Sequence, residues 1–185
     1  MKKTLANRLI IQMIEMSLNK IFKNVFLSIG SNENYRKNNL NKAINEIIAL
    51  DKANLINRSP IYETKPMYYE NQRNFLNMVI EISTSFNPKE LLKELKYIEK
   101  KIGRNFNKPI NTSRVIDIDI VVFDNLIINE KDLIIPHKGI KERPFVILPL
   151  SDINPKIVVP KINKTSSELL LMLEYNQDII KLYEK

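Results

Sequence analysis

In two stretches of the chain, every second residue carries an apolar side chain. The apolar positions are Leu76, Met78, Ile80 and Ile82 in the first stretch and Ile116, Ile118, Ile120 and Val122 in the second. Successive side chains of a β-strand point to opposite faces, whereas an α-helix repeats about every 3.6 residues. Residues 75–82 and 115–123 are therefore predicted to be strands that bury one face and keep the other partly polar.

Two other segments have the pattern of amphipathic helices. Residues 36–50 place their apolar side chains on one stripe. A second helix is expected from Pro88, because Asn87 suits the N-cap position and Gly103 suits a left-handed C-terminal cap. Further strands are expected at 25–29 and 55–63. The latter should be an edge or bulged strand, since Pro60 cannot donate a backbone hydrogen bond.

After residue 123 the pattern predicts a hairpin formed by residues 126–128 and 133–135, a short helix near 144–150 and a C-terminal helix from about 165. The order is thus strand, helix, strand, strand, helix, strand, followed by a C-terminal extension. Two helices on one face of a mostly antiparallel sheet make an α+β fold, here a ferredoxin-like α/β sandwich. The other face of the sheet is expected to be free to bind a ligand.

The composition excludes several kinds of chemistry. A chain of 185 residues suffices for one domain, which is expected to span residues 24–185. There is no cysteine and His137 is the only histidine, which excludes disulfide scaffolds, thiol nucleophiles and multi-histidine metal sites. The three glycines lack the spacing of a P-loop or a dinucleotide-binding loop. Any bound phosphate must then be held by side chains and metal ions.

Residues 1–23 are interpreted as an N-terminal extension. One helical face could be formed by Leu5, Leu9, Met13 and Met16. Three interpretations remain open: an appended functional helix, a weak organellar presequence, or sequence upstream of a natural start at Met16, and the last two are favoured. The apolar run is too short to span a membrane and lacks the features of a secretory signal. A cytoplasmic protein without a membrane partner is expected.

Asp117 and Asp119 stand on the same side of one predicted strand, separated by a single residue. Side chains at positions i and i+2 of a strand lie roughly 6 to 7 Å apart. Two carboxylates so close repel each other unless a cation neutralises them, and Mg²⁺ favours a few carboxylates together with substrate phosphates. The spacing indicates a metal site, although two solvent-facing charges on a strand would give the same pattern.

Basic and aromatic side chains can gather near this pair. Arg104, Arg114 and Arg143 are each able to reach the same end of the sheet, and a guanidinium group matches the geometry of phosphate oxygens. His137 can donate to a phosphate or transfer a proton. Phe75 and Asn77 share the non-core face of their strand, where a ring and an amide together suit a flat polar heterocycle.

Several short motifs occur in the order found in one enzyme family. They are Phe26-Leu-Ser-Ile-Gly-Ser-Asn32, Tyr62-Glu-Thr-Lys-Pro66, Phe75-Leu-Asn77, Ile102-Gly-Arg104, Arg114-Val-Ile-Asp-Ile-Asp-Ile120, Pro136-His137 and Arg143-Pro-Phe145. On these motifs the chain, from about residue 24 to 160, resembles the 6-hydroxymethyl-7,8-dihydropterin pyrophosphokinases of folate biosynthesis. The resemblance implies transfer of the β,γ-pyrophosphoryl group of ATP to the hydroxymethyl oxygen of the pterin.

The resemblance also implies a role for particular residues. Two Mg²⁺ ions on the ATP phosphates would be held by Asp117 and Asp119. The triphosphate would be stabilised by Arg104, Arg114, His137 and Arg143, with Ile98 and Glu99 also near the nucleotide. The pterin would be bound by Thr64, Pro66, Met67, Phe75, Asn77 and Phe145. The chain departs from the family pattern at 110–114, where a basic residue and an aromatic residue are missing, and at Lys65, Phe75 and Phe106.

Two other functions are compatible with the pattern. The ferredoxin-like order also occurs in RNA-binding modules, and the formal net charge of +8 would suit a nucleic acid. Residues 75–82 lack the glycine expected in such a module, and two aspartates would repel a phosphate backbone. An inactive pyrophosphokinase homologue, suggested by the altered loop, is the other possibility. The expected partners are ATP and the pterin, with no nucleic acid, and a monomer is expected.

Overall fold

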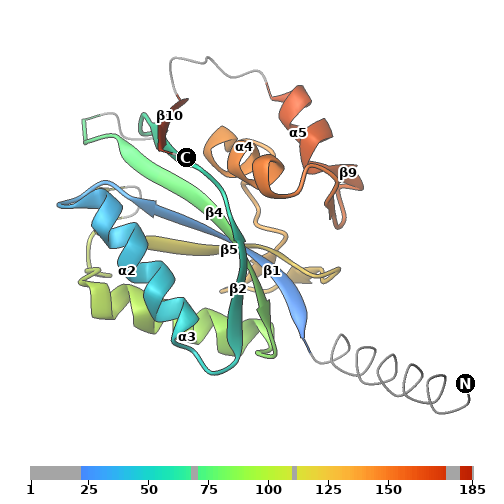
Figure 1. The fold of residues 1–185 in the computed structure, drawn as a ribbon, viewed down its shortest axis with the longest axis horizontal. Coiled ribbons are helices and arrows are strands. Elements are labelled where there is room, and N and C mark those ends of the chain that lie inside the picture. The colour runs from blue at the N-terminus through green and yellow to red at the C-terminus, as the bar shows by residue number, and fades with distance from the viewer. Residues whose placement is uncertain (1–21, 68–70, 110–111, 174–179, 185) are drawn as a thin grey trace, which may run out of the picture.

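The computed structural model describes residues 22–67, 71–109, 112–173 and 180–184. Residues 1–21, which make up nearly all of the predicted N-terminal extension, lie outside the described part of the chain. The described residues form one large antiparallel sheet with two helices against one face and a smaller C-terminal group of elements against the other (Figure 1). Among the described residues, no helix is long and apolar enough to cross a membrane.

The central sheet has the strand order expected of a ferredoxin-like fold. It runs β10, β3, β4, β1, β5, and β2 also pairs with β4. The strands are β1 (Lys23–Ser31), β2 (Ala53–Arg58), β3 (Ile61–Thr64), β4 (Phe75–Thr84), β5 (Asp117–Phe123) and β10 (Ile180–Glu184). All pairs are antiparallel. The predicted α+β fold is confirmed, but β10 was not foreseen.

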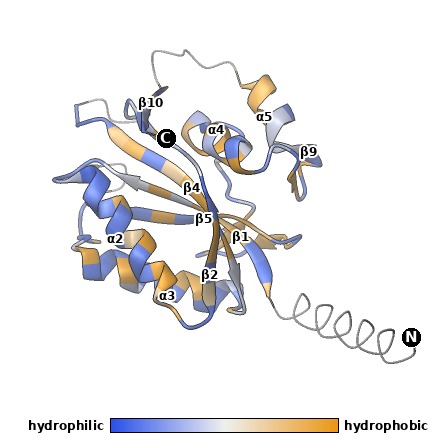
Figure 2. Ribbon diagram, viewed as in Figure 1, coloured by the Kyte–Doolittle hydropathy of each residue, from blue (hydrophilic) through white to orange (hydrophobic). Residues whose placement is uncertain are grey.

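The two helices on the first face lie where their sequences predict them, although the first ends at Ile48 and not at residue 50. They are α2 (Arg36–Ile48) and α3 (Pro88–Ile102). The side chain of Asn87 accepts hydrogen bonds from the backbone of Lys89 and Glu90, and the Glu90 carboxylate accepts one from the Asn87 backbone. Gly103 ends α3 with a φ of 108°. In Figure 2 both helices carry hydrophobic and hydrophilic stretches in alternation, so each buries one stripe against the sheet.

The predicted strand at 55–63 is two strands, β2 and β3, because the ladder is interrupted at Ser59 and Pro60. There the Ser59 backbone N–H donates to the Val79 carbonyl (2.9 Å), and the Ser59 hydroxyl accepts from the Val79 N–H (3.0 Å). The side chain of Ser59 thus replaces one backbone hydrogen bond of the ladder. As a result β2 and β3 both pair with β4 but cover different parts of it.

The expectation that the second face of the sheet is free is wrong for part of that face. The helix α4 (Pro144–Ile153) packs there with α5 (Ser166–Met172), and together they bury a second apolar cluster. The sheet contributes Phe26, Val79, Val121 and Val122 to this cluster. The first cluster, under α2 and α3, contains the even-numbered apolar side chains of β4. The uncovered part of the second face is the part that can bind a ligand.

The prediction that Val122 shares the face of Ile116, Ile118 and Ile120 is also wrong. The register between β1 and β5 shifts between Phe26 and Leu27, which pair with Val122 and Ile120. One extra residue on β5 is a β-bulge, and it moves every later side chain to the opposite face. Val122 therefore packs in the second cluster and Phe123 in the first.

Short elements complete the chain. They are the hairpin of β6 (Ile128–Asn129) and β7 (Ile134–Ile135), and the hairpin of β8 (Val158–Val159) and β9 (Lys164–Thr165). The first is the hairpin predicted from the sequence. The helix predicted from about 165 is confirmed as α5, and its side-chain cap is Thr165, which accepts from the Glu168 backbone N–H at 3.2 Å.

Candidate active site

One row of side chains crosses the second face of the sheet. In register, Asp117 of β5 lies opposite Gly30 of β1, Gly30 opposite Asn77 of β4, and Asn77 opposite Tyr62 of β3. Directly opposed residues in antiparallel strands point to the same face. The carboxylate of Asp117 and the amide of Asn77 are consequently on one surface, separated only by a residue without a side chain.

A cavity of about 650 Å³, open to solvent, lies over this row. The six residues that the resemblance assigns to the pterin all line it: Thr64, Pro66, Met67, Phe75, Asn77 and Phe145. Both predicted metal ligands, Asp117 and Asp119, line the same cavity, as do Arg114 and Arg143. Side chains from β3, β4, β5 and the start of α4 thus meet in one place, although they are far apart in the sequence.

Asn77 is held in a single orientation at the base of the cavity. Its side chain is buried, and its Nδ2 donates to the hydroxyl of Thr64 at 2.7 Å. A Cβ atom built on Gly30 would lie 2.6 Å from Asn77 Oδ1, which is shorter than any ordinary contact. The close approach of the amide therefore requires a glycine at position 30. The amide oxygen points toward Gly30, along the row of side chains beneath the cavity.

Replacing Gly30 with alanine is expected to displace the Asn77 amide and to weaken binding of a heterocycle in the cavity by roughly tenfold or more, since the added methyl group cannot fit without movement. The measurement is the dissociation constant of the dihydropterin. Gly103→Ala is the matched control. There is open space around Gly103 but its φ is positive, so this change should lower stability by roughly 1 kcal/mol and leave the dissociation constant unaltered. Equal affinities of Gly30→Ala and the parent chain would contradict the argument.

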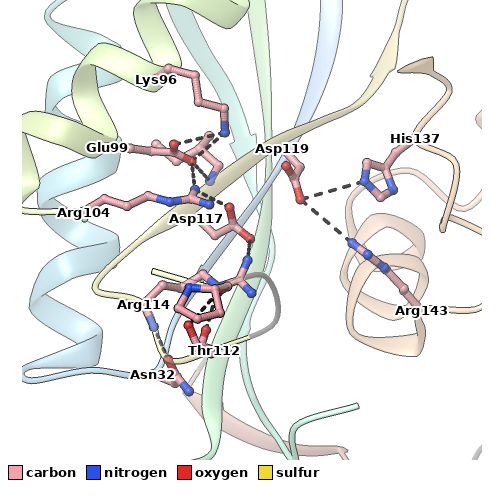
Figure 3. A network of polar contacts seen from close by, with 12 residues as sticks. Asn32, Lys96, Glu99, Arg104, Thr112, Arg114, Asp117, Asp119, His137 and Arg143 are labelled. Atoms are coloured by element: carbon pink, nitrogen blue, oxygen red, sulfur yellow. Dashed lines mark hydrogen bonds and ion pairs between the residues drawn. The ribbon is translucent and has the colours of Figure 1, made fainter. Parts of the chain in front are cut away.

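Asp117 is clamped by two arginines (Figure 3). Arg104 Nη1 lies 2.5 Å from its Oδ1, and Arg114 Nη1 lies 2.5 Å from its Oδ2. Although burial raises the pKa of this carboxyl group, the charges of Arg114 and Arg104 hold the pKa below its ordinary value. Asp117 is consequently ionised, and the two guanidinium groups are concentrated at one end of the cavity.

Asp119 has more distant partners than Asp117. Its Oδ2 is 3.9 Å from His137 Nε2 and 3.9 Å from Arg143 Nη1 (Figure 3). Burial and the nearby charge of Asp117 raise the pKa of Asp119 to about 6. Both of these contacts are longer than a hydrogen bond, so a cation placed next to this carboxylate would be stabilised.

The backbone fixes which nitrogen of His137 carries the proton. The N–H of Gly139 donates to His137 Nδ1 at 3.1 Å, so the hydrogen of the neutral ring is on Nε2, the nitrogen that faces Asp119. Burial, together with the charge of Arg143, lowers the pKa of His137 to about 4. The imidazole is therefore a neutral hydrogen-bond donor directed at the acidic pair.

Two of the predicted nucleotide residues have side chains that face the interior. Ile98 packs in the first apolar cluster, so only its backbone can contact a ligand. Glu99 is fully buried and accepts from the Ile118 backbone N–H at 2.6 Å, while Arg104 Nη1 lies 2.6 Å from its Oε1 and Lys96 Nζ 3.0 Å from its Oε2. Burial raises the pKa of Glu99, and the charge of Lys96 offsets part of this rise. Glu99 thus joins α3 to the strand that carries both aspartates.

Asn32 has a structural role that the sequence did not reveal beyond the turn signal at residues 30–32. The side chain is fully buried; its Oδ1 accepts from the Arg114 backbone N–H at 2.8 Å, and its Nδ2 donates to Gln72 Oε1 at 3.0 Å. It also donates to the Arg73 carbonyl at 3.1 Å. One side chain therefore ties three segments together, namely the end of β1, residues 72–73 and the stretch at Arg114.

Replacement of Asn32 with alanine should destabilise the protein by roughly 2 to 3 kcal/mol, because buried backbone groups lose their partners. The check is thermal unfolding, compared with Asn38→Ala at an exposed position of α2. We also expect the Asn32 variant to lose affinity for ligands at both ends of the cavity. Similar unfolding temperatures for the two variants would show that the three segments are held by other contacts.

A second hollow of about 490 Å³ adjoins the first, and Arg114 contributes to both. It is lined by the loop that departs from the family pattern. The Arg104 guanidinium lies 4.9 Å from the centre of the Phe106 ring, within the range of a cation–π contact, and Lys108 forms an ion pair with Glu33. Arg104 is therefore held between Phe106 and Asp117, and it connects the altered loop to the site.

The donor set suits a magnesium ion shared with a phosphate ligand. Within the described ranges there is no group of three or more acidic or histidine side chains able to enclose a metal. Asp117 and Asp119 present two carboxylates in an open cavity. Mg²⁺ is usually bound by one or two carboxylates together with substrate phosphates and water, and not by a cage made only of protein groups. The residues present therefore fit this ion.

The sequence is similar to known proteins over most of its length. The sequence model of the 7,8-dihydro-6-hydroxymethylpterin-pyrophosphokinase family matches residues 26–155. A pyrophosphokinase of Aquifex aeolicus named for 2-amino-4-hydroxy-6-hydroxymethyldihydropteridine is 37% identical over 147 residues, covering 78% of this chain and 88% of that protein. The folic acid synthesis protein of Schizosaccharomyces pombe is 35% identical over 84% of this chain.

The fold agrees with a solved structure as well. The Plasmodium falciparum HPPK-DHPS crystallised with pterin and p-hydroxybenzoate superposes with a TM-score of 0.69 at 18% identity, over 87% of this chain and 45% of that one. The chain spans only 21% of the Schizosaccharomyces pombe protein and 22% of a similar protein of Dictyostelium discoideum. From the family match and the Aquifex aeolicus relative, we conclude that this chain belongs to the 7,8-dihydro-6-hydroxymethylpterin-pyrophosphokinase family.

Proposed function

We propose that the chain transfers the pyrophosphoryl group of ATP to the hydroxymethyl group of 6-hydroxymethyl-7,8-dihydropterin, yielding AMP and the pterin diphosphate for folate biosynthesis. The observation that carries the proposal is that one cavity holds two different kinds of surface. Two aromatic rings and an amide lie at one end of it, and two carboxylates with arginines lie at the other. A flat heterocycle and a polyphosphate can therefore be held side by side.

The pterin end is built from Phe75, Phe145 and Asn77. The Thr64 hydroxyl occupies one N–H of the Asn77 amide, so the Oδ1 atom and the second N–H remain to accept from and donate to the edge of a pterin. The Arg114 guanidinium lies 6.0 Å from the Phe75 ring centre and that of Arg143 lies 5.8 Å from the Phe145 ring centre. Each ring thus adjoins a cation that belongs to the phosphate end.

The phosphate end is built from the acidic pair and the basic side chains around it. Two Mg²⁺ ions, held by Asp117 and Asp119, would neutralise charge on the triphosphate when bound. Arg104 and Arg114 approach from the α3 side of β5, and His137 and Arg143 approach from the α4 side (Figure 3). Cationic and donor groups on both sides of the acidic pair suit a ligand with several phosphate oxygens.

The reaction then depends on positioning and charge stabilisation. The hydroxymethyl oxygen of the pterin attacks the β-phosphorus, the bond from that phosphorus to the α,β-bridging oxygen breaks, and AMP leaves while the hydroxyl proton is lost to solvent. Arginines and the neutral His137 donate to the transferred oxygens, where negative charge accumulates. No side chain needs to form a covalent intermediate.

The direct test is to supply ATP, Mg²⁺ and the hydroxymethyl dihydropterin and to identify the products by chromatography and mass spectrometry. AMP and the pterin diphosphate should appear in equal amounts. ADP as the sole nucleotide product would reject pyrophosphoryl transfer, and ATP binding without product would favour the inactive homologue. No observation favours the nucleic-acid-binding alternative. The cytoplasmic location and the monomeric state expected from the sequence stay predictions.

A further inference from the structure

The C-terminal strand β10 extends the sheet beside the strand that carries Thr64. In register, Ile180 lies opposite Thr64, and Thr64 lies opposite Phe75. The family match ends at residue 155, so β10 lies outside it. Without β10, the four-residue strand β3 would be an edge strand, paired only with β4. Edge strands expose unpaired backbone groups and are easily displaced.

The side chain of Ile180 is on the face that binds the pterin. Directly opposed residues share a face, so Ile180, Thr64 and Phe75 point to the same side of the sheet. Ile180 is 7% exposed, whereas Leu182 on the same strand is 51% exposed. Ile180 is thus the buried apolar neighbour of Thr64, whose hydroxyl accepts the hydrogen bond from Asn77.

Ion pairs connect both strands to the start of α2. Lys37 Nζ lies 2.6 Å from Glu184 Oε2 at the end of β10, and Arg36 Nη1 lies 2.6 Å from Glu63 Oε1 on β3. Arg36 also donates to the Asn74 carbonyl at 2.8 Å, just before β4. The strands β10 and β3 and the entry to β4 are therefore anchored to one helix.

We propose that β10 is a positioning element for the pterin end of the site. It holds β3 in place through the ladder and through Ile180, and so fixes the Thr64 hydroxyl that orients the Asn77 amide. The strands β3, β4 and β1 separate β10 from β5, which carries both aspartates. Loss of β10 therefore weakens binding of the pterin and leaves binding of the nucleotide unaltered. The inference rests on the function proposed above.

The first experiment compares the full chain with a chain that ends at Leu173. The probes are the dihydropterin and a non-hydrolysable ATP analogue with Mg²⁺, each measured separately by calorimetry. We expect the shortened chain to bind the pterin roughly tenfold more weakly, about the effect of one lost hydrogen bond at the ligand, and to bind the nucleotide analogue as the full chain does. A peptide of residues 174–185 added in excess should restore pterin affinity.

Two point variants give the same test without shortening the chain. Ile180→Ala should weaken pterin binding several-fold, whereas Leu182→Ala, at an exposed position of the same strand, should not. If the shortened chain does not fold, these two variants still show whether β10 positions the pterin end of the site. Unchanged pterin affinity in Ile180→Ala, or equal losses for pterin and nucleotide, would overturn the positioning role. Failure of the full chain to bind the pterin at all would instead reject the proposed function.

Discussion

Replacing Asp119 with asparagine is expected to lower kcat by roughly a factor of 100 to 1,000, the usual effect of removing one group that stabilises charge in a transition state. The amide has nearly the shape of the carboxylate but carries no charge. In the structure the Arg143 guanidinium and the neutral His137 ring both lie 3.9 Å from Asp119, so the change breaks no close ion pair with either of them. The measurement is the steady-state rate of AMP formation at saturating Mg²⁺.

The same variant should be as stable as the parent chain or more stable. Folding raises the pKa of Asp119 to about 6, so at neutral pH the ionised form is less favourable in the folded chain than in the unfolded one. A neutral amide removes that cost. Asp124→Asn, which alters a half-exposed ion pair with Lys23 away from the cavity, is the matched control and should retain full activity. A parent-like rate for Asp119→Asn would contradict the metal assignment.

Replacing Glu99 with alanine is expected to destabilise the protein by roughly 3 to 5 kcal/mol, the usual cost of removing one partner from a buried ion pair. The Ile118 N–H would lose its acceptor, and Arg104 would lose one of its two carboxylates. For a chain of this length each kcal/mol shifts the unfolding temperature by about 2 to 4 °C. Thermal unfolding monitored by circular dichroism should therefore show a fall of about 10 °C.

Glu94→Ala is the matched control, since Glu94 lies on the same helix at a half-buried position. It should change the unfolding temperature by no more than about 2 °C, as substitutions near the surface generally do. If both variants unfold alike, Glu99 does not join α3 to β5 as the contacts indicate. If Glu99→Ala binds the nucleotide analogue normally despite its lower stability, the role of Glu99 is confined to the fold.

Most strands of the central sheet, the caps of α3 and the fold class were predictable because each follows from local chemistry. The capping box at Asn87 and the alternation in β4 need no information from distant parts of the chain. The grouping of the two aspartates with Phe75 and Asn77 also followed, since register and a one-residue spacing place them on one face. The six residues expected at the pterin line one cavity, as the resemblance implied.

The features that escaped prediction depend on partners far away in the sequence. The bulge in β5 is visible only in its pairing with β1, and it moved Val122 to the second face. The burial of Asn32 results from contacts with residues 72–73 and 114, which no pattern near residue 32 reveals. The segment at 180–184 is short, and it forms a strand because β3 offers it a partner. The resemblance implied that Glu99 lies near the nucleotide, and its full burial could not be read from the pattern of its helix.

The row across β5, β1 and β4 has a consequence for molecules designed to occupy the cavity. Those three strands form a stiff floor, because β1 and β4 are hydrogen-bonded on both sides and β5 packs against both apolar clusters. The walls come from separate pieces of chain: residues 64–67, the stretch around Arg114, and the first turn of α4. Few chemical groups of an inhibitor should therefore fit where it contacts the strands of the floor. More varied substituents should be tolerated where it contacts the walls.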